Sequence, residues 1–226
     1  IPKHKIQEYF LPICKEFDMN YSLYFTNQIP SVAIFVSRYT HCLYDLLLRY
    51  RESQFKCNIS FIISNHLQAK KIADSFSIKF FYFPIKSQNK QEQEKKLIFL
   101  LKKEKIDLIV LARYTQILTK QFVDKFPNKI INIHHSFLPA FVGREPYKQA
   151  YSRGVKIIGA TSHYVTEELD AGPIIEQDTV RITHKDTLED LKQKGQDLEK
   201  LVLSRAVRWH LEHKILVYNN KTVIFD

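Results

Sequence analysis

The feature that most constrains the fold is the alternation of two residue patterns between residues 30 and 133. Short apolar, β-branched runs recur, such as SVAIFVS at 31–37 and IDLIVLA at 106–112. Such runs suit strands that are buried on both faces of a sheet. Segments of helical period separate them, so the sequence predicts an α/β fold with a mostly parallel sheet covered on both sides. Strands are expected at 31–37, 58–64, 77–83, 106–112 and 129–133, and helices at 42–51, 67–76, 91–105 and 121–125.

The rest of the chain extends this pattern in both directions. After residue 133 we expect a helix at 146–153, strands at 156–164 and 174–181, a long helix at 188–213 opened by Thr187, and a hairpin of 215–218 and 222–225. Before Pro30, an apolar stripe predicts a helix at 3–17, followed by a short strand at 20–26. We therefore expect one main domain at 30–226, because residues 1–29 are too few to form a domain alone.

The composition excludes several classes of protein. The chain of 226 residues is 45% hydrophobic and 13% aromatic, which supports a packed core and argues against disorder. No run of 18 apolar residues occurs, and the first residues lack a signal-peptide pattern, so no membrane partner is expected. The three cysteines, Cys14, Cys42 and Cys57, fit no metal spacing and are expected to be reduced thiols of a cytoplasmic protein.

The net charge of +10 indicates an anionic partner or simply lysine-rich surfaces. Basic runs such as 102–105 contain acidic residues and lie in amphipathic helical patterns, without aromatic residues placed for stacking on bases. We therefore interpret the charge as solvated helix faces and expect no nucleic-acid partner.

Chemically useful side chains concentrate in residues 131–177. Asn132 and His134 lie two apart at the end of the fifth expected strand, so their side chains point the same way. Ligands of open α/β sheets bind beyond this edge of the strands. Asp170 lies in a polar turn, and an imidazole beside a carboxylate suits acid–base chemistry near neutral pH. An asparagine amide can donate to a developing oxyanion.

Two other interpretations of these residues stay open at this point. A histidine, asparagine or aspartate near a turn is commonly a cap or a satisfied polar group. His134, His135, His163 and Asp170 could also bind a metal, but neither an HExxH motif nor paired cysteines occur, and we expect no metal.

Several stretches resemble one family of enzymes in combination. NIHHSFLPAF, PYKQAYSRGVKIIGATSHYV and ELDAGPIIEQD are similar to formyltetrahydrofolate deformylases, of the folate-dependent formyl hydrolase/transferase superfamily. SRYTHCLYDLL, VLARYTQIL and VLSRAVRWHLEHKILVYNNKTVIF extend the resemblance to nearly the whole chain. It implies a Rossmann-like formyltransferase fold preceded by a partial ACT (ferredoxin-like) segment. Residues 1–29 resemble only the last helix and strand of an ACT domain, and the front half is expected to be missing.

The resemblance also implies the site residues. The family's N-x-H and D-x-G patterns fall on Asn132, His134 and Asp170, and a supporting histidine falls on His163. The folate pocket would be formed largely by backbone groups of two loops, at 113–118 and 166–170. The implied substrate-binding residues are Arg113, Tyr114, Thr115, Gln116, Ile117, Leu118, Gly143, Thr166, Glu167, Glu168 and Leu169. Arg144, where relatives usually carry a small residue, is a departure beside the site.

The implied activity is hydrolysis of 10-formyltetrahydrofolate to formate and tetrahydrofolate, which supplies formate for purine synthesis and balances one-carbon folates. His134 and Asn132 would hold the formyl oxygen, and Asp170 would orient water and take its proton. His163 would fix Asp170 or a bridging water. We expect no cofactor beyond the folate substrate, and we expect a homo-oligomer.

Three alternatives are weighed against hydrolysis. A phosphoribosyl-amine formyltransferase needs a glycine-rich phosphate loop after the first strand, and residues 37–41 (SRYTH) contain no glycine. A methionyl-tRNA formyltransferase carries a further C-terminal domain, and none is expected here. A non-catalytic folate-binding or ACT-linked regulatory paralogue agrees with the partial ACT segment but not with intact Asn132, His134 and Asp170.

Overall fold

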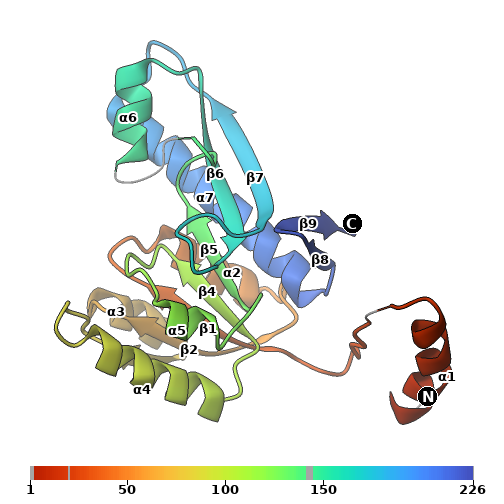
Figure 1. Ribbon diagram of the computed structural model, residues 1–226. Helices are drawn as coiled ribbons and strands as arrows, with labels where there is room; N and C mark the ends of the chain where they lie inside the picture. Colours follow the sequence, from red (N-terminus) through yellow and green to blue (C-terminus); the bar gives the residue numbers. More distant parts are fainter. Residues whose placement is uncertain (1–2, 20, 141–144, 226) are drawn as a thin grey trace.

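A seven-stranded sheet in the order β3-β2-β1-β4-β5-β6-β7 forms the centre of the computed structural model, which describes residues 3–19, 21–140 and 145–225 (Figure 1). The first five strands are parallel, and β6 and β7 are antiparallel to their neighbours. The strands are β1 (Ser31–Val36), β2 (Asn58–Ser64), β3 (Lys79–Tyr82), β4 (Leu108–Ala112), β5 (Ile130–His134), β6 (Ile157–Tyr164) and β7 (Ile174–Arg181).

Helices cover both faces of the sheet, as the alternating pattern predicts. The side chains of α2 (His41–Arg51), α3 (Gln68–Ser75) and α7 (Leu188–Leu211) share one apolar core with one face. Those of α4 (Lys90–Lys103) and α5 (Lys120–Val123) pack on the other face. A smaller core joins α6 (Pro146–Arg153) to the start of α7. All five residues of β4 are buried, which explains its continuous apolar sequence.

The long helix α7 begins where its sequence predicts. The side chain of Thr187 accepts a hydrogen bond from the backbone of Asp190, and the Asp190 carboxylate accepts one from the backbone of Thr187. This capping box satisfies two amide groups that a helix start leaves unpaired. After α7, the hairpin of β8 (Ile215–Tyr218) and β9 (Lys221–Ile224) packs against β7.

The order of the strands reverses beside β1. The chain runs outward from β1 through β2 to β3, and then returns to place β4 on the other side of β1. In such sheets, the loops after the two central strands diverge and leave a binding crevice at the carboxyl edge. The loops after β4 and β5 begin at this edge, which is where the sequence places the candidate site.

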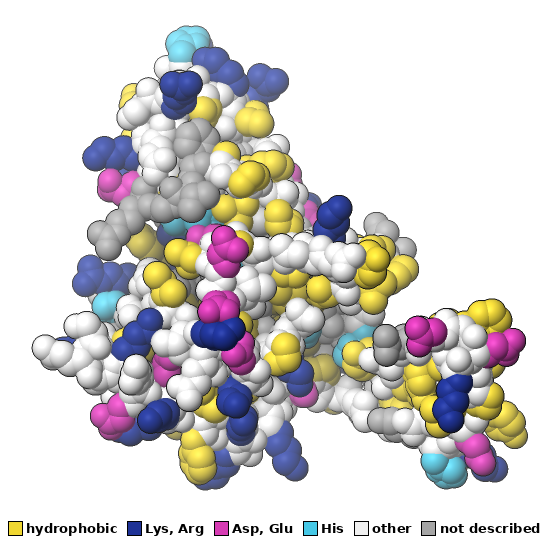
Figure 2. All heavy atoms as spheres, viewed as in Figure 1, with side chains coloured by type: hydrophobic (Ala, Val, Ile, Leu, Met, Phe, Trp, Pro, Cys, Tyr) yellow, Lys and Arg dark blue, Asp and Glu magenta, His cyan; other side chains and the backbone are white. Residues whose placement is uncertain are grey.

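The structure corrects one prediction near the N-terminus, the short strand at 20–26. The helix α1 (Lys3–Glu16) is present, but the described residues 21–26 form no strand. A strand needs a partner for its backbone groups, and among the described residues no segment pairs with these. Figure 1 shows α1 apart from the sheet, and Figure 2 shows apolar side chains on the surface of this part of the chain. Tyr9 in α1 and Phe17, just after it, are both exposed.

Two further surface features follow from the described residues. None of the described helices is long and apolar enough to cross a lipid bilayer. On the face shown in Figure 2, lysine and arginine side chains are scattered and acidic side chains lie among them.

Candidate active site

The pairing of β5 with β6 brings three of the four predicted catalytic side chains together. Asn132 lies directly opposite His163 in this antiparallel ladder, and His134 lies opposite Thr161. Residues opposite each other, and residues two apart on one strand, share a face of the sheet. Asn132, His134 and His163 therefore point to the same side, as the N-x-H spacing predicted for the first two.

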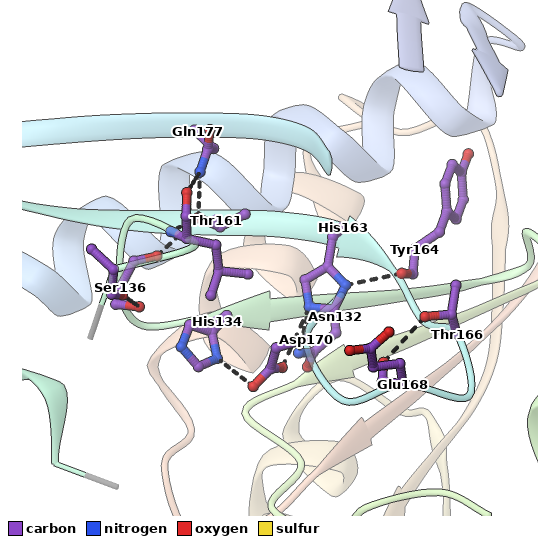
Figure 3. Close-up of polar contacts among 12 residues, drawn as sticks. Asn132, His134, Ser136, Thr161, His163, Tyr164, Thr166, Glu168, Asp170 and Gln177 are labelled. Atoms are coloured by element: carbon purple, nitrogen blue, oxygen red, sulfur yellow. Dashed lines mark hydrogen bonds and ion pairs between the residues drawn. The ribbon is translucent and has the colours of Figure 1, made fainter. Parts of the chain in front are cut away.

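A turn between β6 and β7 delivers Asp170 to these three residues (Figure 3). Asp170 has a left-handed backbone conformation with φ of 56°, which aspartate tolerates better than most residues. Two residues later, the turn packs tightly against β6. A Cβ atom on Gly172 would lie 1.8 Å from the carbonyl oxygen of Tyr164, so glycine is required there. This packing fixes the position of the turn relative to β6, and therefore the position of Asp170.

Asp170 contacts both imidazoles, each with a different oxygen. Its Oδ2 lies 3.2 Å from Nδ1 of His134, and its Oδ1 lies 3.6 Å from Nε2 of His163. The first distance suits a charge-assisted hydrogen bond, whereas the second is too long for one. Asp170 therefore orients His134 directly.

The hydrogen bonds of His163 define its tautomer. Its Nδ1 donates to the carbonyl oxygen of Tyr164 at 2.9 Å, so Nδ1 carries a hydrogen. In the neutral ring, Nε2 then accepts, and the side-chain nitrogen of Asn132 donates to it at 3.2 Å. An amide nitrogen has two hydrogens, so the second hydrogen of Asn132 stays free for another acceptor. His163 thus holds the Asn132 amide by a hydrogen bond of 3.2 Å, whereas its distance of 3.6 Å from Asp170 is too long for one.

The electrostatics keep Asp170 ionised. Burial raises the pKa of its carboxyl group, but the two neighbouring imidazoles, of which His134 is hydrogen-bonded to it, outweigh burial and hold this pKa well below its usual value. An ionised Asp170 requires a hydrogen on Nδ1 of His134. Nε2 of His134 is buried and has no hydrogen-bond partner among the described residues. A buried polar atom of this kind is available to a ligand.

These groups line a cavity of about 350 Å³. The two predicted folate loops form its other walls, since every residue of 113–118 and 166–170 lines it. At the rim, Ile117 and Leu169 expose 58% and 57% of their surfaces. A concave site with apolar walls and a few convergent polar groups is typical of small-molecule binding. Gly143 and Arg144 lie outside the described residues.

The loop after β4 is held in place by Ser37, a residue that the sequence analysis did not identify as part of the site. Ser37 directly follows β1 and is fully buried. Its backbone nitrogen donates to the carbonyl oxygen of Arg113 at 3.3 Å, and its hydroxyl accepts from the backbone nitrogen of Thr115 at 3.1 Å. The hydroxyl in turn donates to Asn65 at 2.7 Å. These bonds tie the predicted folate loop to the central strand.

A second group of missed residues supports the segment after His134. The hydroxyl of Thr161 donates to the carbonyl oxygen of Ser136 and accepts from the backbone nitrogen of Leu138, at 2.8 and 3.1 Å (Figure 3). Gln177 donates to the same hydroxyl at 2.9 Å and to the carbonyl oxygen of Leu138 at 3.0 Å. The only hint in the sequence was the presence of polar residues inside strands that are otherwise apolar.

His135 lies beside His134 and lines the cavity, but its side chain is not one of the two imidazoles that contact Asp170. Burial, together with the charge of Arg113, lowers the pKa of His135 to about 3. Its ring is therefore neutral at physiological pH. The ring lies 5.3 Å from that of His134 and 5.8 Å from that of Tyr147.

Comparisons with known proteins agree with this geometry. The formyl transferase family matches residues 31–207. A formyltetrahydrofolate deformylase of Synechocystis is 55% identical over 213 residues, which cover 94% of this chain and 75% of that protein. One of Bacillus subtilis is 49% identical over 224 residues, covering 99% of this chain and 75% of that protein.

Solved structures share the fold. A formyltetrahydrofolate deformylase of Pseudomonas syringae has a TM-score of 0.97 at 45% identity, covering 100% of this chain and 76% of that one. A glycinamide ribonucleotide transformylase of Symbiobacterium toebii has a TM-score of 0.83 at 28% identity, covering 91% of this chain and 99% of that one. On these similarities, this chain belongs to the formyltetrahydrofolate deformylase family.

Proposed function

We propose that this protein hydrolyses 10-formyltetrahydrofolate to formate and tetrahydrofolate. The observation that carries the proposal is that three groups meet at one cavity. They are Nε2 of His134, which has no partner among the described residues, the Asn132 amide, which has one hydrogen left to donate, and the ionised carboxylate of Asp170. Hydrolysis of an amide needs these groups, because the carbonyl oxygen becomes negative as water attacks. The name that curated relatives carry, formyltetrahydrofolate deformylase, supports this substrate.

In the proposed mechanism, His134 and Asn132 bind the formyl oxygen. Asp170 stabilises positive charge on His134 through Nδ1, so Nε2–H can donate to the oxygen as it becomes negative. The free hydrogen of the Asn132 amide donates to the same oxygen. Water adds to the formyl carbon, and the bond from this carbon to N10 of the folate then breaks.

Asp170 is proposed to orient the water and to transfer its proton. The attacking water loses one proton, and the leaving N10 gains one, so formic acid and tetrahydrofolate result, and the acid ionises at neutral pH. A carboxylate with a lowered pKa is a weak base in the resting enzyme. It gains basicity as the negative charge forms on the neighbouring oxygen, and it passes the proton on to N10. Each role belongs to a side chain or to the folate, so we propose that the reaction needs no further cofactor.

Transfer to a phosphoribosyl amine is the second candidate, because transformylases share the fold. The loop after β1 argues against it. The backbone nitrogen of Ser37 and its hydroxyl are already used by the loop at 113–118, and bulky side chains follow at Arg38 and Tyr39. A phosphate cradle needs free backbone amides that can approach an anion closely.

Formate release from 10-formyltetrahydrofolate tests the proposal. We expect turnover with water alone, and no acceleration and no formylated product when glycinamide ribonucleotide is added. Saturable stimulation by the ribonucleotide, lost in Arg38→Ala, would move the chain to the transferases. Folate binding without formate release would instead identify a non-catalytic paralogue. Supply of formate to purine synthesis, a cytoplasmic location and homo-oligomeric assembly are proposed with this activity, by similarity to the family.

A further inference from the structure

A buried glutamate lies behind the active site and takes no part in the proposed chemistry. Glu199 lies in the middle of α7, and its side chain is 1% exposed. Its Oε2 lies 2.7 Å from Nε2 of His41 and 3.4 Å from Nε of Arg113, and its Oε1 accepts from the hydroxyl of Tyr147 at 2.5 Å. Burial raises the pKa of Glu199, but His41, Arg113 and Tyr147 together bring this pKa below its usual value. The carboxylate is therefore ionised and well paired.

A glycine makes room for one of these contacts. Gly195 lies one turn before Glu199 on α7, and a Cβ atom there would lie 2.2 Å from the hydroxyl and ring of Tyr147. Glycine inside a helix costs about 1 kcal/mol relative to alanine. At this position it allows the Tyr147 ring to cross the helix and reach the carboxylate. The sequence marks the same site, because Glu199 interrupts the apolar stripe that includes Leu198 and Val202.

The same residues are poorly suited to a metal ion. Ligand atoms of His41, Cys42 and Glu199 lie within 4.8 Å of one another, the only such group among the described residues. However, the guanidinium of Arg113 faces the same carboxylate oxygen and would repel a cation. Burial also raises the pKa of the Cys42 thiol well above its usual value, which disfavours the thiolate that a metal binds.

Two of the partners of Glu199, Arg113 and Tyr147, connect it to the active site. Arg113 lines the cavity and is the first residue of the predicted folate loop, with a left-handed φ of 61°. Its Nε is buried and makes no hydrogen bond within the described chain. Glu199 is the carboxylate that faces it, and the guanidinium also lies 5.2 Å from the centre of the Tyr39 ring. Tyr147 packs edge-on against His135, whose ring lies next to that of His134.

We propose that Glu199 is a positioning residue of the active site. It acts through two contacts, one with Arg113 and one with Tyr147, which we call the Arg113 arm and the Tyr147 arm. The Arg113 arm holds the folate loop, and the Tyr147 arm holds His135 against the catalytic His134. This inference rests on the proposed hydrolysis and deepens it, because it assigns substrate binding and the alignment of His134 to one buried charge.

The variant Glu199→Gln tests the Arg113 arm, since it removes the charge but keeps the size of the side chain and an oxygen that can accept the hydrogen bond from Tyr147. An unbalanced Arg113 loosens the folate loop, so we expect KM for 10-formyltetrahydrofolate and Kd for tetrahydrofolate to rise about fivefold or more. Loss of the Tyr147 arm alone should affect alignment and not binding. We expect Tyr147→Phe and Gly195→Ala to lower kcat by about threefold or more, with Kd for tetrahydrofolate within about twofold of wild type.

The control is Glu189→Gln, which removes an exposed glutamate from the same helix and should change neither constant. A folded Glu199→Gln with KM, kcat and Kd at wild-type values would overturn the proposal, as would identical effects of Glu199→Gln and Tyr147→Phe on binding. If Glu199→Gln does not fold, the split between kcat and Kd in Tyr147→Phe and Gly195→Ala decides. Binding of tetrahydrofolate needs no turnover, so the inference is tested even if the wild-type protein releases no formate.

Discussion

The side-chain nitrogen of Asn132 lies 3.2 Å from Nε2 of His163, its direct neighbour on the adjacent strand. Because Nδ1 of His163 is committed to the backbone of Tyr164, the ring presents an acceptor to the amide. This bond leaves one amide hydrogen for the formyl oxygen. We therefore propose that His163 acts on the reaction by orienting Asn132.

Asn132→Ala should remove a donor to the developing oxyanion and raise the barrier by roughly 2 to 4 kcal/mol. His163→Ala should lower kcat by a smaller factor, because the amide stays present but loses its orientation. If His163 acts through Asn132, the double variant should be no slower than Asn132→Ala. Steady-state kinetics of the four proteins decide, and additive effects of the two substitutions would contradict this coupling.

Asp170→Asn should lower kcat by about a hundredfold or more while the protein still folds and binds tetrahydrofolate. Asparagine retains the shape of aspartate but can neither stabilise charge on His134 nor carry the proton. Formate release and calorimetric binding of tetrahydrofolate measure the two properties. A kcat close to that of wild type would remove Asp170 from the mechanism.

The pH profile provides a further test of Asp170. Its carboxyl pKa is held below the usual value by the two imidazoles, so protonation occurs at lower pH than for an exposed aspartate, near 3.9. A loss of activity caused by this group must therefore lie below about pH 4. We expect any acid limb of kcat above pH 5 to persist in the residual activity of Asp170→Asn, because a different group causes it.

The periodic patterns of the sequence predicted most of the fold, since burial on both faces forces continuous apolar runs. The strand β2, for example, has the bounds that its sequence predicts. The short strand at 20–26 was wrong, because local β-propensity does not supply a partner strand. Pairing depends on residues far apart in the chain, and no window of sequence contains that information.

The site was predictable where it depends on strand geometry or on family motifs. Asn132 and His134 share a face because they are two apart, and the structure places Asp170 beside them. The supporting groups Ser37, Thr161 and Glu199 were missed. Each looks like an ordinary polar residue until the fold brings its partners to it, as with Glu199 and His41, which are 158 residues apart.

Thr161→Val should weaken the protein and its activity together. The buried hydroxyl connects Ser136, Leu138 and Gln177, and its loss leaves buried polar groups without partners, at a cost of about 1 to 3 kcal/mol in the free energy of unfolding. The segment after His134 should shift, so kcat should fall as well. Thr179→Val, at an exposed position of β7, is the matched control and should have little effect on either urea unfolding or kcat.

Gly172→Ala should separate the Asp170 turn from the sheet. A Cβ atom there would lie 1.8 Å from the carbonyl oxygen of Tyr164, which belongs to β6 and cannot move without disturbing His163. Overpacking of this kind costs typically about 1 to 3 kcal/mol of stability. Because the turn carries Asp170, we also expect kcat/KM to fall by tenfold or more, since an ångström of misplacement can cost about a hundredfold.

Gly154→Ala is the control for Gly172→Ala. Gly154 ends α6 with a φ of 67°, and a Cβ atom there meets no other atom within 4 Å. Alanine should therefore cost only the strain of the left-handed conformation, roughly 1 to 2 kcal/mol, and should leave kcat/KM unchanged. Urea unfolding and formate release for both variants test whether Gly172, the glycine of the D-x-G motif, positions Asp170 or only contributes to the stability of the fold. If Gly172→Ala lost stability but kept wild-type kcat/KM, the close contact with Tyr164 would not be what holds Asp170 in place.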